Sequence, residues 1–307
     1  MLVKVSVLIP TYNAEQFIMP LLSKLENQKL PEGVAMEIIL VDSSSTDRTK
    51  GIVKEQFPNV QFHTIPNKEF NHGGTRNMLA DLATGEFLLY MTQDAIPFDD
   101  KLIMFLLENF QDENVLIACG RQIPKEDANP LEKYARSFNY PDKRIIKDKS
   151  KISELGIKTF FNSNVCSMYR ATLFHGSEFH GFPNNVILNE DIILSYYVIM
   201  KGYKVIYDNR AIVYHSHNYS IKQQFKRNFD IGMAFNESEF MLQNVSNEKE
   251  GIKLVLGQLK YLIKNGYVTQ VPRCIVESGM KFIGYNLGRR HHLFSEKTKR
   301  KLSAYMK

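Results

Sequence analysis

The amino-acid sequence predicts an α/β fold with a Rossmann-like, mostly parallel central sheet flanked by helices, followed by a helical C-terminal extension. Three observations support this prediction. Over residues 4–120, short apolar runs alternate with helix-like stretches joined by short links, which is typical of a three-layer parallel sheet. Beyond residue 221 only helical spacing of apolar residues recurs. A chain of 307 residues is long enough for one large α/β domain and a helical appendage.

The first strands and helices follow one another in regular order. Strands are expected where short apolar runs occur, at residues 4–9, 37–41, 60–65, 87–91 and 115–119. Helices are expected between them, at residues 17–27, 46–56, 75–83 and 100–110. In such sheets, ligands bind beyond the carboxyl ends of the strands.

The second half of the chain is less regular. Residues 121–160 are polar, rich in lysine and contain three prolines, so we expect a long excursion over the surface. Residues 161–217 return to α/β character, with the segment 162–169, a helix at 191–200 and a strand at 204–207. We therefore expect a catalytic domain over residues 1–220 and a helical region over residues 221–307.

Composition excludes several classes of protein. The three cysteines are widely separated, which argues against a disulfide scaffold or a zinc knuckle and favours a reducing cytoplasm. No run of about 18 apolar residues occurs, so no membrane span is expected. The start of the chain runs directly into a strand, so no signal peptide is expected.

The positive charge is concentrated at the C-terminal end. Residues 281–307 contain eight Lys or Arg and one acid, whereas the whole chain has a net charge of +6. Such a segment suits anionic lipid headgroups or nucleic acid, or is simply a solvated terminus. Since the basic residues are not interleaved with aromatic ones, nucleic-acid binding is not expected. The apolar stripe at 254–263 suits core packing, a homodimer contact or a membrane surface.

Polar residues follow three of the expected strands. They are Pro10, Thr11 and Asn13 after the first strand, Asp42 and Ser44 after the second, and Gln93 and Asp94 after the run at 87–91. The carboxylate of Asp42 suits a base N–H or a ribose hydroxyl, and Asp94 suits a divalent cation shared with diphosphate oxygens. Each residue alone is also an ordinary turn former or helix cap. Their common position at one sheet edge favours a nucleotide site.

Two familiar phosphate-binding devices are absent from the sequence. The turn after the first strand contains no glycine, and no P-loop lysine pattern occurs. A dinucleotide-dependent oxidoreductase and a P-loop enzyme are therefore excluded, since both need glycine where the backbone approaches phosphate. A metal ion on Asp94 is the natural substitute.

Two further groups of residues suit catalysis. Glu190 and Asp191 open an apolar segment, so both carboxylates are expected at a helix N-terminus, where an oriented carboxylate can act as a general base or merely as a cap. His215 and His217 lie two residues apart on an extended segment, which places both imidazoles on one side. That arrangement suits a metal ion or a packed strand end.

Five ordered motifs resemble those of family 2 glycosyltransferases with the GT-A fold. They are the stretches at 7–13, 41–47, 93–95, 181–182 and 189–191. Residues 70–77, 92–95 and 215–220 further resemble rhamnosyltransferases that use dTDP-L-rhamnose. The similarity is closest to streptococcal enzymes that extend the rhamnose backbone of cell-wall polysaccharides on a polyprenyl diphosphate.

The resemblance implies a role for each matching residue. Thr11 and Asp42 would contact the nucleoside, together with Pro10, Asn13, Ser44 and Gln93 at the same sheet edge. His72 and Gly73 would form a donor-sugar loop or only a turn before a helix, and Arg76 and Arg227 would neutralise the diphosphate. Asp94 would bind the metal, Mg²⁺ or Mn²⁺, with His215 and His217, although Thr92 stands where the family motif has its first aspartate.

The implied reaction is inverting transfer of L-rhamnose to a lipid-linked saccharide. Asp191, beside Glu190, matches the catalytic base. The acceptor implies an enzyme at the inner face of the cytoplasmic membrane, held there by the basic C-terminal region. Two alternatives remain open: the same chemistry with UDP-GlcNAc, UDP-Glc or UDP-Gal, and a catalytically silent nucleotide-sugar-binding subunit.

Overall fold

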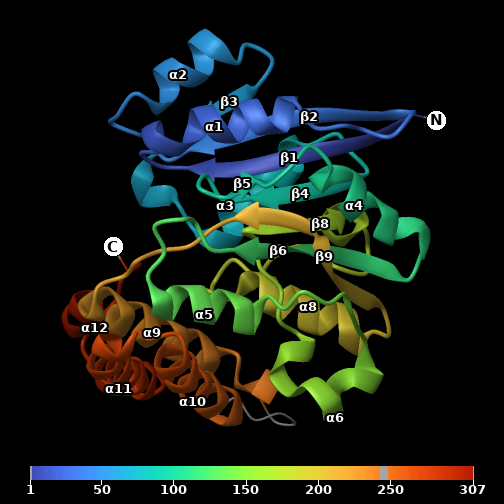
Figure 1. Cartoon of the computed structure of the whole chain (residues 1–307). Coiled ribbons are helices and arrows are strands. Elements are labelled where there is room, and N and C mark those ends of the chain that lie inside the picture. The colour runs from blue at the N-terminus through green and yellow to red at the C-terminus, as the bar shows by residue number, and fades with distance from the viewer. Residues whose placement is uncertain (1, 243–247, 307) are drawn as a thin grey trace.

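The computed structural model describes residues 2–242 and 248–306. Its centre is one sheet in the order β3-β2-β1-β4-β8-β6-β9-β5, with β7 paired to β9 and helices on both sides (Figure 1). The strands are β1 (Val3–Thr11), β2 (Val34–Asp42), β3 (Gln61–Thr64), β4 (Phe87–Met91), β5 (Ile96–Pro97), β6 (Val115–Ile123), β7 (Ile145–Lys147), β8 (Cys166–Arg170) and β9 (Lys204–Tyr214). All five strands expected in the first 120 residues are present: β1 and β2 are longer at both ends, β6 is longer at its carboxyl end, β4 has the expected ends and β3 is shorter.

The sheet is mixed rather than mostly parallel. Strands β3, β2, β1 and β4 pair in parallel, and so do β6 and β9. Strand β8 lies antiparallel between β4 and β6. After β6 the chain passes through α5, β7 and α6 and enters β8 at the end of the sheet where β6 finished, so β8 runs in the opposite direction. Loops after β1, β4 and β9 nevertheless meet on one side.

The helices of the first half lie close to their expected positions. They are α1 (Glu15–Glu26), α2 (Thr49–Gln56), α3 (His72–Leu82) and α4 (Leu102–Glu108). Helix α3 begins earlier than expected, because the Asn71 side chain caps it by accepting a hydrogen bond from the Gly74 amide. Gly73 is thus inside the helix. A side chain there would collide with the Pro183 carbonyl, since an added Cβ would lie 2.0 Å from that oxygen.

The polar segment 121–160 has more structure than its composition suggests. It contains α5 (Pro130–Asn139), β7 and α6 (Ile152–Leu155). Asn129 caps α5 and Pro130 occupies its first turn, a favourable position for proline because the missing N–H needs no partner there. The sequence did not indicate these elements. Strand β7 is held by its pairing with β9, and α5 packs against α10, so both depend on contacts with distant segments.

The later helices are α7 (Thr172–His175), α8 (Glu190–Met200), α9 (Ile221–Glu237), α10 (Glu248–Lys264), α11 (Val271–Gly288) and α12 (Glu296–Leu302). Helix α9 begins at the expected start of the helical region. It packs closely on α11 because Gly284 and Gly288 leave room for the backbone of α9; a Cβ at Gly288 would lie 2.0 Å from the Phe229 carbonyl oxygen. The helical region also contacts α5, where Gln258 Nε2 donates to the Leu131 carbonyl (3.0 Å).

Apolar side chains form a core on each face of the sheet, one beneath α1 and α4 and the other beneath α3 and α8. The site described below lies above these layers, where the strands end. In the part of the chain that the structure describes, no helix is long and apolar enough to cross a bilayer. Whether residues 1–220 and 221–307 behave as separate domains stays a prediction.

Candidate active site

The loops after β1 and β2 form a connected floor. Asp42 is 2% exposed, and its carboxylate accepts hydrogen bonds from the Thr11 hydroxyl (3.1 Å) and from the Ser45 amide (2.8 Å) and hydroxyl. Asn13 lies in the left-handed region (φ 48°), and its Oδ1 accepts from the Thr46 amide at 2.9 Å. Asp42 and Asn13 therefore shape the loops, and much of the acceptor capacity of Asp42 is already used.

A large cavity opens above this floor. It encloses about 590 Å³, which is suitable for a nucleotide sugar. Five residues expected to bind the donor line it: Pro10, Thr11, His72, Arg76 and Gln93. Its remaining lining comes from Tyr12, Ser43, Asn67, Lys68, Phe70, Asn71, Thr92, Val186, Ile187, Ala304, Tyr305 and Met306.

Three lining residues carry buried polar atoms that lack a hydrogen-bond partner within residues 2–242 and 248–306. These atoms are Ser43 Oγ, Arg76 Nε and Thr92 Oγ1. Since a buried polar group without a partner costs about 1–3 kcal/mol, such groups concentrate where a ligand supplies the missing bonds. The cavity is therefore the strongest ligand site among the described residues.

Four expected donor-binding residues do not line the cavity and instead support it. Asn13 and Asp42 shape the loops, Ser44 donates its hydroxyl to the Ile65 carbonyl (2.8 Å), and Gly73 packs on Pro183. A fifth, Arg227, lies behind the wall: its Nη1 donates to the Tyr305 hydroxyl at 2.6 Å. Their direct contact with a donor stays a prediction.

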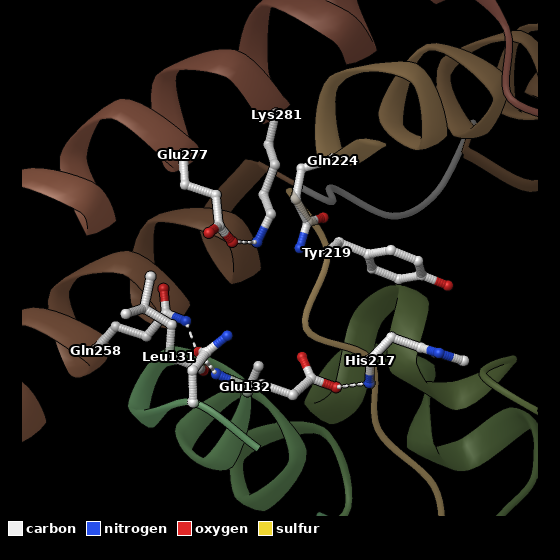
Figure 2. Close-up of a pocket in the computed structure, with 10 residues that line it drawn as sticks. Leu131, Glu132, His217, Tyr219, Gln224, Gln258, Glu277 and Lys281 are labelled. Carbon is white, nitrogen blue, oxygen red and sulfur yellow. Dashed lines mark hydrogen bonds and ion pairs between the residues drawn. The ribbon is translucent and has the colours of Figure 1, made fainter. Parts of the chain in front are cut away.

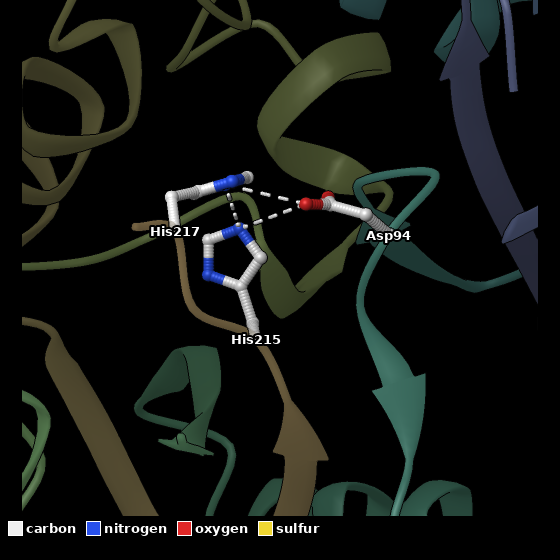
Figure 3. A group of neighbouring side chains, drawn as sticks. All are labelled: Asp94, His215 and His217. Atoms are coloured by element: carbon white, nitrogen blue, oxygen red, sulfur yellow. Dashed lines mark hydrogen bonds and ion pairs between the residues drawn. The ribbon is translucent and has the colours of Figure 1, made fainter. Parts of the chain in front are cut away.

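Asp94, His215 and His217 converge on one point (Figure 3). Asp94 Oδ2 lies 3.5 Å from His215 Nε2 and 3.2 Å from His217 Nε2, and the two imidazole nitrogens are 3.1 Å apart. The three candidate ligand atoms lie within 4.8 Å of one another, so one ion can contact all of them. The expected grouping of these residues is present, with Asp94 following β4 and both histidines following β9.

The tautomer of His215 is set by its neighbours. His215 Nδ1 lies 2.9 Å from Gln122 Oε1, which also accepts from Arg136 Nη1 at 2.6 Å. Because an amide oxygen only accepts, His215 carries its proton on Nδ1, which leaves the Nε2 lone pair toward Asp94. Burial and the nearby Arg136 charge hold the pKa of His215 well below its ordinary value. A neutral imidazole with a free nitrogen is the form that binds metal.

A second, much smaller cavity lies behind His217 (Figure 2). It measures about 10 Å³, room for about one water molecule, and lies between α5, α9, α10 and α11. The His217 amide faces Glu132 Oε1 at 3.4 Å on one side, and Lys281 pairs with Glu277 at 2.8 Å on the other. This cavity is too small for a substrate. Residues of the helical region and His217 line it together, so it lies between that region and the candidate metal ligands Asp94, His215 and His217, here called the metal-ligand cluster.

Glu190 and Asp191 lie at the start of α8, as expected, but in different surroundings. Glu190 is buried and pairs with Arg76 (3.1 Å). Burial opposes ionisation of Glu190. The charges of Arg76 and His72 and the hydrogen bond from the Asn164 side chain outweigh burial and hold the pKa of Glu190 below its ordinary value. The geometry therefore gives Glu190 the role of counterion to Arg76, which leaves Asp191 as the carboxylate suited to accept a proton.

Asp191 is partly exposed, and its environment favours the protonated form. Loss of hydration, followed by the neighbouring Glu190 charge, raises the pKa of Asp191 to about 7. The Asn164 amide donates to Asp191 Oδ2 at 2.9 Å, while the Asn164 side chain donates to Glu190 at 3.1 Å. Asn164 thus holds both carboxylates, and the Tyr169 hydroxyl fixes it by donating to its Oδ1 at 2.6 Å.

Neither Asp94 nor Asp191 lines the large cavity. Asp94 directly follows lining residues in the sequence, and Asp191 is the neighbour of Glu190, which pairs with a lining arginine. Thr92 and Gln93 precede Asp94, and Arg76 joins the cavity to Glu190. The sequence did not reveal Gln122, Asn164 or Tyr305 as site residues. Gln122 is a polar residue near the end of the apolar strand β6, and Asn164 lies in the polar turn before β8, so neither gives a strong signal. Tyr305 lies in a tail whose composition indicated exposure.

Comparisons with known proteins agree with this geometry. Residues 6–176 match the model of "Glycosyl transferase family 2". The chain is 37% identical to the O-antigen chain rhamnosyltransferase RfbN of Salmonella typhimurium over 98% of its length and 95% of the relative. It is 38% identical to the O-antigen chain rhamnosyltransferase WbaN of Salmonella anatum over 98% of its length and 94% of that protein.

Solved structures share the fold at lower identity. The mannosyltransferase PcManGT from Pyrobaculum calidifontis, in complex with GDP-Man and Mn²⁺, has a TM-score of 0.58 and 16% identity, over 97% of this chain and 84% of that one. S. aureus TarS 1–349 in complex with UDP-GlcNAc has a TM-score of 0.55 and 16% identity, over 99% and 93% of the two chains.

Proposed function

This chain belongs to glycosyltransferase family 2 and is a rhamnosyltransferase of surface-polysaccharide synthesis, and we propose that its donor is dTDP-β-L-rhamnose, its acceptor a saccharide on a polyprenyl diphosphate, and its reaction inverting. The GT-A fold expected from the sequence motifs is confirmed, as is the resemblance to rhamnosyltransferases. The closer resemblance to streptococcal enzymes stays a prediction.

The observation that carries the proposal is the large cavity with unpaired polar atoms beside the metal-ligand cluster. The cavity is lined by the loops after β1, β2 and β4, where a nucleotide binds in sheets of this kind. Arg76 reaches it from α3, and Thr92 and Gln93 connect it directly to Asp94. A sugar nucleotide lying in it would have its diphosphate near Asp94, His215 and His217, the group of described residues suited to hold a cation.

Asp94, His215 and His217 fit a divalent cation, and we propose Mn²⁺ rather than Mg²⁺. Imidazole nitrogen suits transition metals, whereas Mg²⁺ prefers an all-oxygen shell with several waters. These three ligands would leave coordination positions for diphosphate oxygens. When bound, such an ion would offset the negative charge that grows on the departing nucleotide.

Asp191 acts as the general base in the proposed reaction. Its carboxylate takes the proton of the acceptor hydroxyl as that oxygen forms a bond to the anomeric carbon of rhamnose. The bond from this carbon to the diphosphate breaks, and dTDP leaves with the electron pair. One displacement inverts the anomeric centre, so the product is an α-L-rhamnoside. A pKa of about 7 suits a base at neutral pH, because it balances ionisation against proton affinity.

The test of the donor and the reaction is a single incubation. Purified protein is mixed with dTDP-rhamnose and a synthetic lipid-linked saccharide, with and without Mn²⁺ or Mg²⁺, and the product is identified by mass spectrometry and NMR. The proposal expects one or more α-L-rhamnosyl residues and dTDP. A product with retained anomeric configuration, or no transfer under any metal condition, contradicts it.

A UDP-sugar donor is the second candidate. The chain is 26% identical, over 66% of its length, to the S. aureus enzyme named poly(ribitol-phosphate) beta-N-acetylglucosaminyltransferase TarS. Uracil and thymine present the same N3–H and carbonyls, so the loops do not separate them. Running the incubation with UDP-GlcNAc, UDP-Glc and UDP-Gal decides between the donors. Binding of a nucleotide sugar without any transfer favours a catalytically silent subunit.

We propose that helices α10 and α11 contact the membrane that holds the acceptor. Their exposed apolar residues recur at helical spacing: Ile252, Leu256 and Ile263 on α10, and Ile275, Val276, Phe282 and Ile283 on α11. Phe282 is 70% exposed. The same region carries the excess of Lys and Arg, and stable attachment of a protein to an anionic bilayer needs both contributions. The protein would thus be peripheral at the cytoplasmic face.

The surface can be tested without disturbing the site. Ile275→Ser with Phe282→Ser is expected to reduce sedimentation with phosphatidylglycerol vesicles, while transfer to a soluble acceptor is retained. Leu2→Ser, which changes an apolar residue that is 64% exposed elsewhere, is the matched control. Unchanged sedimentation contradicts the membrane contact. A change in oligomeric state instead would assign these stripes to a homodimer.

A further inference from the structure

The last residues of the chain turn back toward the sheet (Figure 1). After α12, the segment Ser303–Met306, here called the C-terminal strap, reaches the large cavity, and Ala304, Tyr305 and Met306 form part of its wall. This position differs from the sequence-based expectation, in which the whole of residues 281–307 served as a basic tail for the membrane. The strap is the only part of the helical region among the cavity's lining residues that the structure describes.

A buried carboxylate on α9 holds the strap in place. Asp230 is fully buried, and its Oδ2 accepts hydrogen bonds from the amides of Ala304 (2.7 Å) and Tyr305 (3.2 Å). Lys226, one turn earlier on α9, donates to the Ser303 carbonyl at 3.1 Å. Burying a charge is costly unless its hydrogen bonds are made. Burial raises the pKa of Asp230, and its Oδ1 has no hydrogen-bond partner among the described residues, so Oδ2 is the atom that holds the strap backbone.

The side chain of Tyr305 connects the cavity to the metal-ligand cluster. Its ring packs edge-to-face against His72, with centroids 5.4 Å apart, and its hydroxyl accepts from Arg227 at 2.6 Å. The Arg227 guanidinium lies 5.5 Å from the centre of the Tyr219 ring, which in turn stacks on His217 at 4.9 Å. Tyr305 therefore lies between a cavity-lining residue of α3 and the residues that back the candidate metal ligands.

We propose that the C-terminal strap completes the donor site, with Tyr305 as a residue that contacts the nucleotide sugar and Asp230 as the positioning residue that holds it there. The inference rests on the proposed function, because the cavity must be the donor site. The Tyr305 ring and the Met306 side chain add apolar contact area to a lining that otherwise comes from the sheet-end loops, α3 and the segment with Val186 and Ile187. The helical region thus takes part in donor binding as well as in contact with the membrane.

The first test measures binding of dTDP-rhamnose to the full chain in the presence of Mn²⁺. Tyr305→Ala is expected to weaken binding about tenfold, the loss that corresponds to one aromatic contact, and to raise the donor KM by the same factor with little change in kcat. Tyr305→Phe, which keeps the ring, should retain most of the affinity. Tyr203→Ala removes a tyrosine outside the cavity lining and serves as control.

The second test addresses Asp230. Asp230→Ala removes the acceptor for both strap amides and should raise the donor KM as Tyr305→Ala does. Asp230→Asn keeps one side-chain oxygen and should restore most of the affinity, a rescue that a role in charge balance alone would not give. Circular dichroism checks that each variant is folded, and Tyr305→Ala tests the strap even where Asp230→Ala does not fold.

The outcomes separate the two proposals. If the wild-type protein does not bind dTDP-rhamnose, the donor assignment fails and the strap inference fails with it. If the wild-type protein binds and Tyr305→Ala binds equally well, only the strap inference is overturned. A loss of kcat with unchanged donor KM in Tyr305→Ala likewise overturns it.

Discussion

Two acidic centres beside the cavity differ in what completes them. Asp94 faces two imidazole nitrogens, His215 Nε2 and His217 Nε2, and the three atoms suit a cation. Asp191 instead lies beside a second carboxylate, Glu190, for which Arg76 is the counterion. Burial, together with the Glu190 charge, raises the pKa of Asp191 to about 7, which suits a proton. The same residue type is thus suited to a metal ion in one centre and to a proton in the other, because its neighbours differ.

The largest effect is expected from Asp191→Asn, which removes the base but keeps the shape. We expect a loss of kcat of about a thousandfold, within the range for general-base residues. Asp99→Asn in a surface loop is the control. Transfer by Asp191→Asn at the wild-type rate would show that Asp191 is not the general base.

The same variant makes a prediction about stability. Because the folded-state pKa of Asp191 lies above the ordinary carboxyl value of 3.8, the folded protein binds this proton more tightly than the unfolded chain. The ionised group therefore destabilises the protein above pH 7, and this penalty disappears as the pH falls toward 4. Asp191→Asn should raise Tm at pH 8 and leave it nearly unchanged at pH 4.5. The same difference in Tm between Asp191→Asn and the wild type at pH 8 and at pH 4.5 would contradict the elevated pKa.

His217→Ala tests the other centre. Losing one of three ligands should weaken Mn²⁺ binding by about a hundredfold, measured by electron paramagnetic resonance titration. His180→Ala, an exposed histidine, is the control. Wild-type affinity for Mn²⁺ in His217→Ala would mean that the Asp-His-His group is not a metal site.

Gln122→Leu sharpens the comparison, because it leaves all three candidate ligands intact. Without the Gln122 oxygen, His215 is no longer held as the Nδ1–H tautomer, and Mn²⁺ affinity should fall about tenfold. Saturating Mn²⁺ should restore kcat. Failure of high metal concentrations to restore activity would point to a packing role for Gln122.

Glu190→Gln should have the smallest effect on the maximum rate and the clearest effect on pH dependence. The wild-type rate is expected to fall as the pH drops through about 7, where Asp191 becomes protonated. Removing the neighbouring negative charge lowers the pKa of Asp191, so this acidic limb should move to lower pH by about one unit. Glu178→Gln on the surface is the control, and an unmoved limb contradicts the coupling.

Much of the architecture follows from local sequence patterns. The strand at 87–91 has the expected ends, and the helix that Glu190 opens begins one residue before its expected start. Such elements are predictable because apolar periodicity and helix caps act between near neighbours. The direction of β8 was not predictable, since it depends on where the chain re-enters the sheet. The short elements between 121 and 160 were not predictable either, because they depend on contacts with distant segments of the chain.

The sequence by itself determined the chemical groups available: carboxylates at Asp94 and Asp191, two histidines on one side of a strand end, and polar loops after the strands. Only the tertiary structure decided their states and partners. Arg76 pairs with Glu190, Gln122 selects the tautomer of His215, and Asp230 draws the end of the chain into the cavity wall. Hydration, charge pairing and burial depend on atoms that distant segments bring together, so a linear pattern cannot specify them.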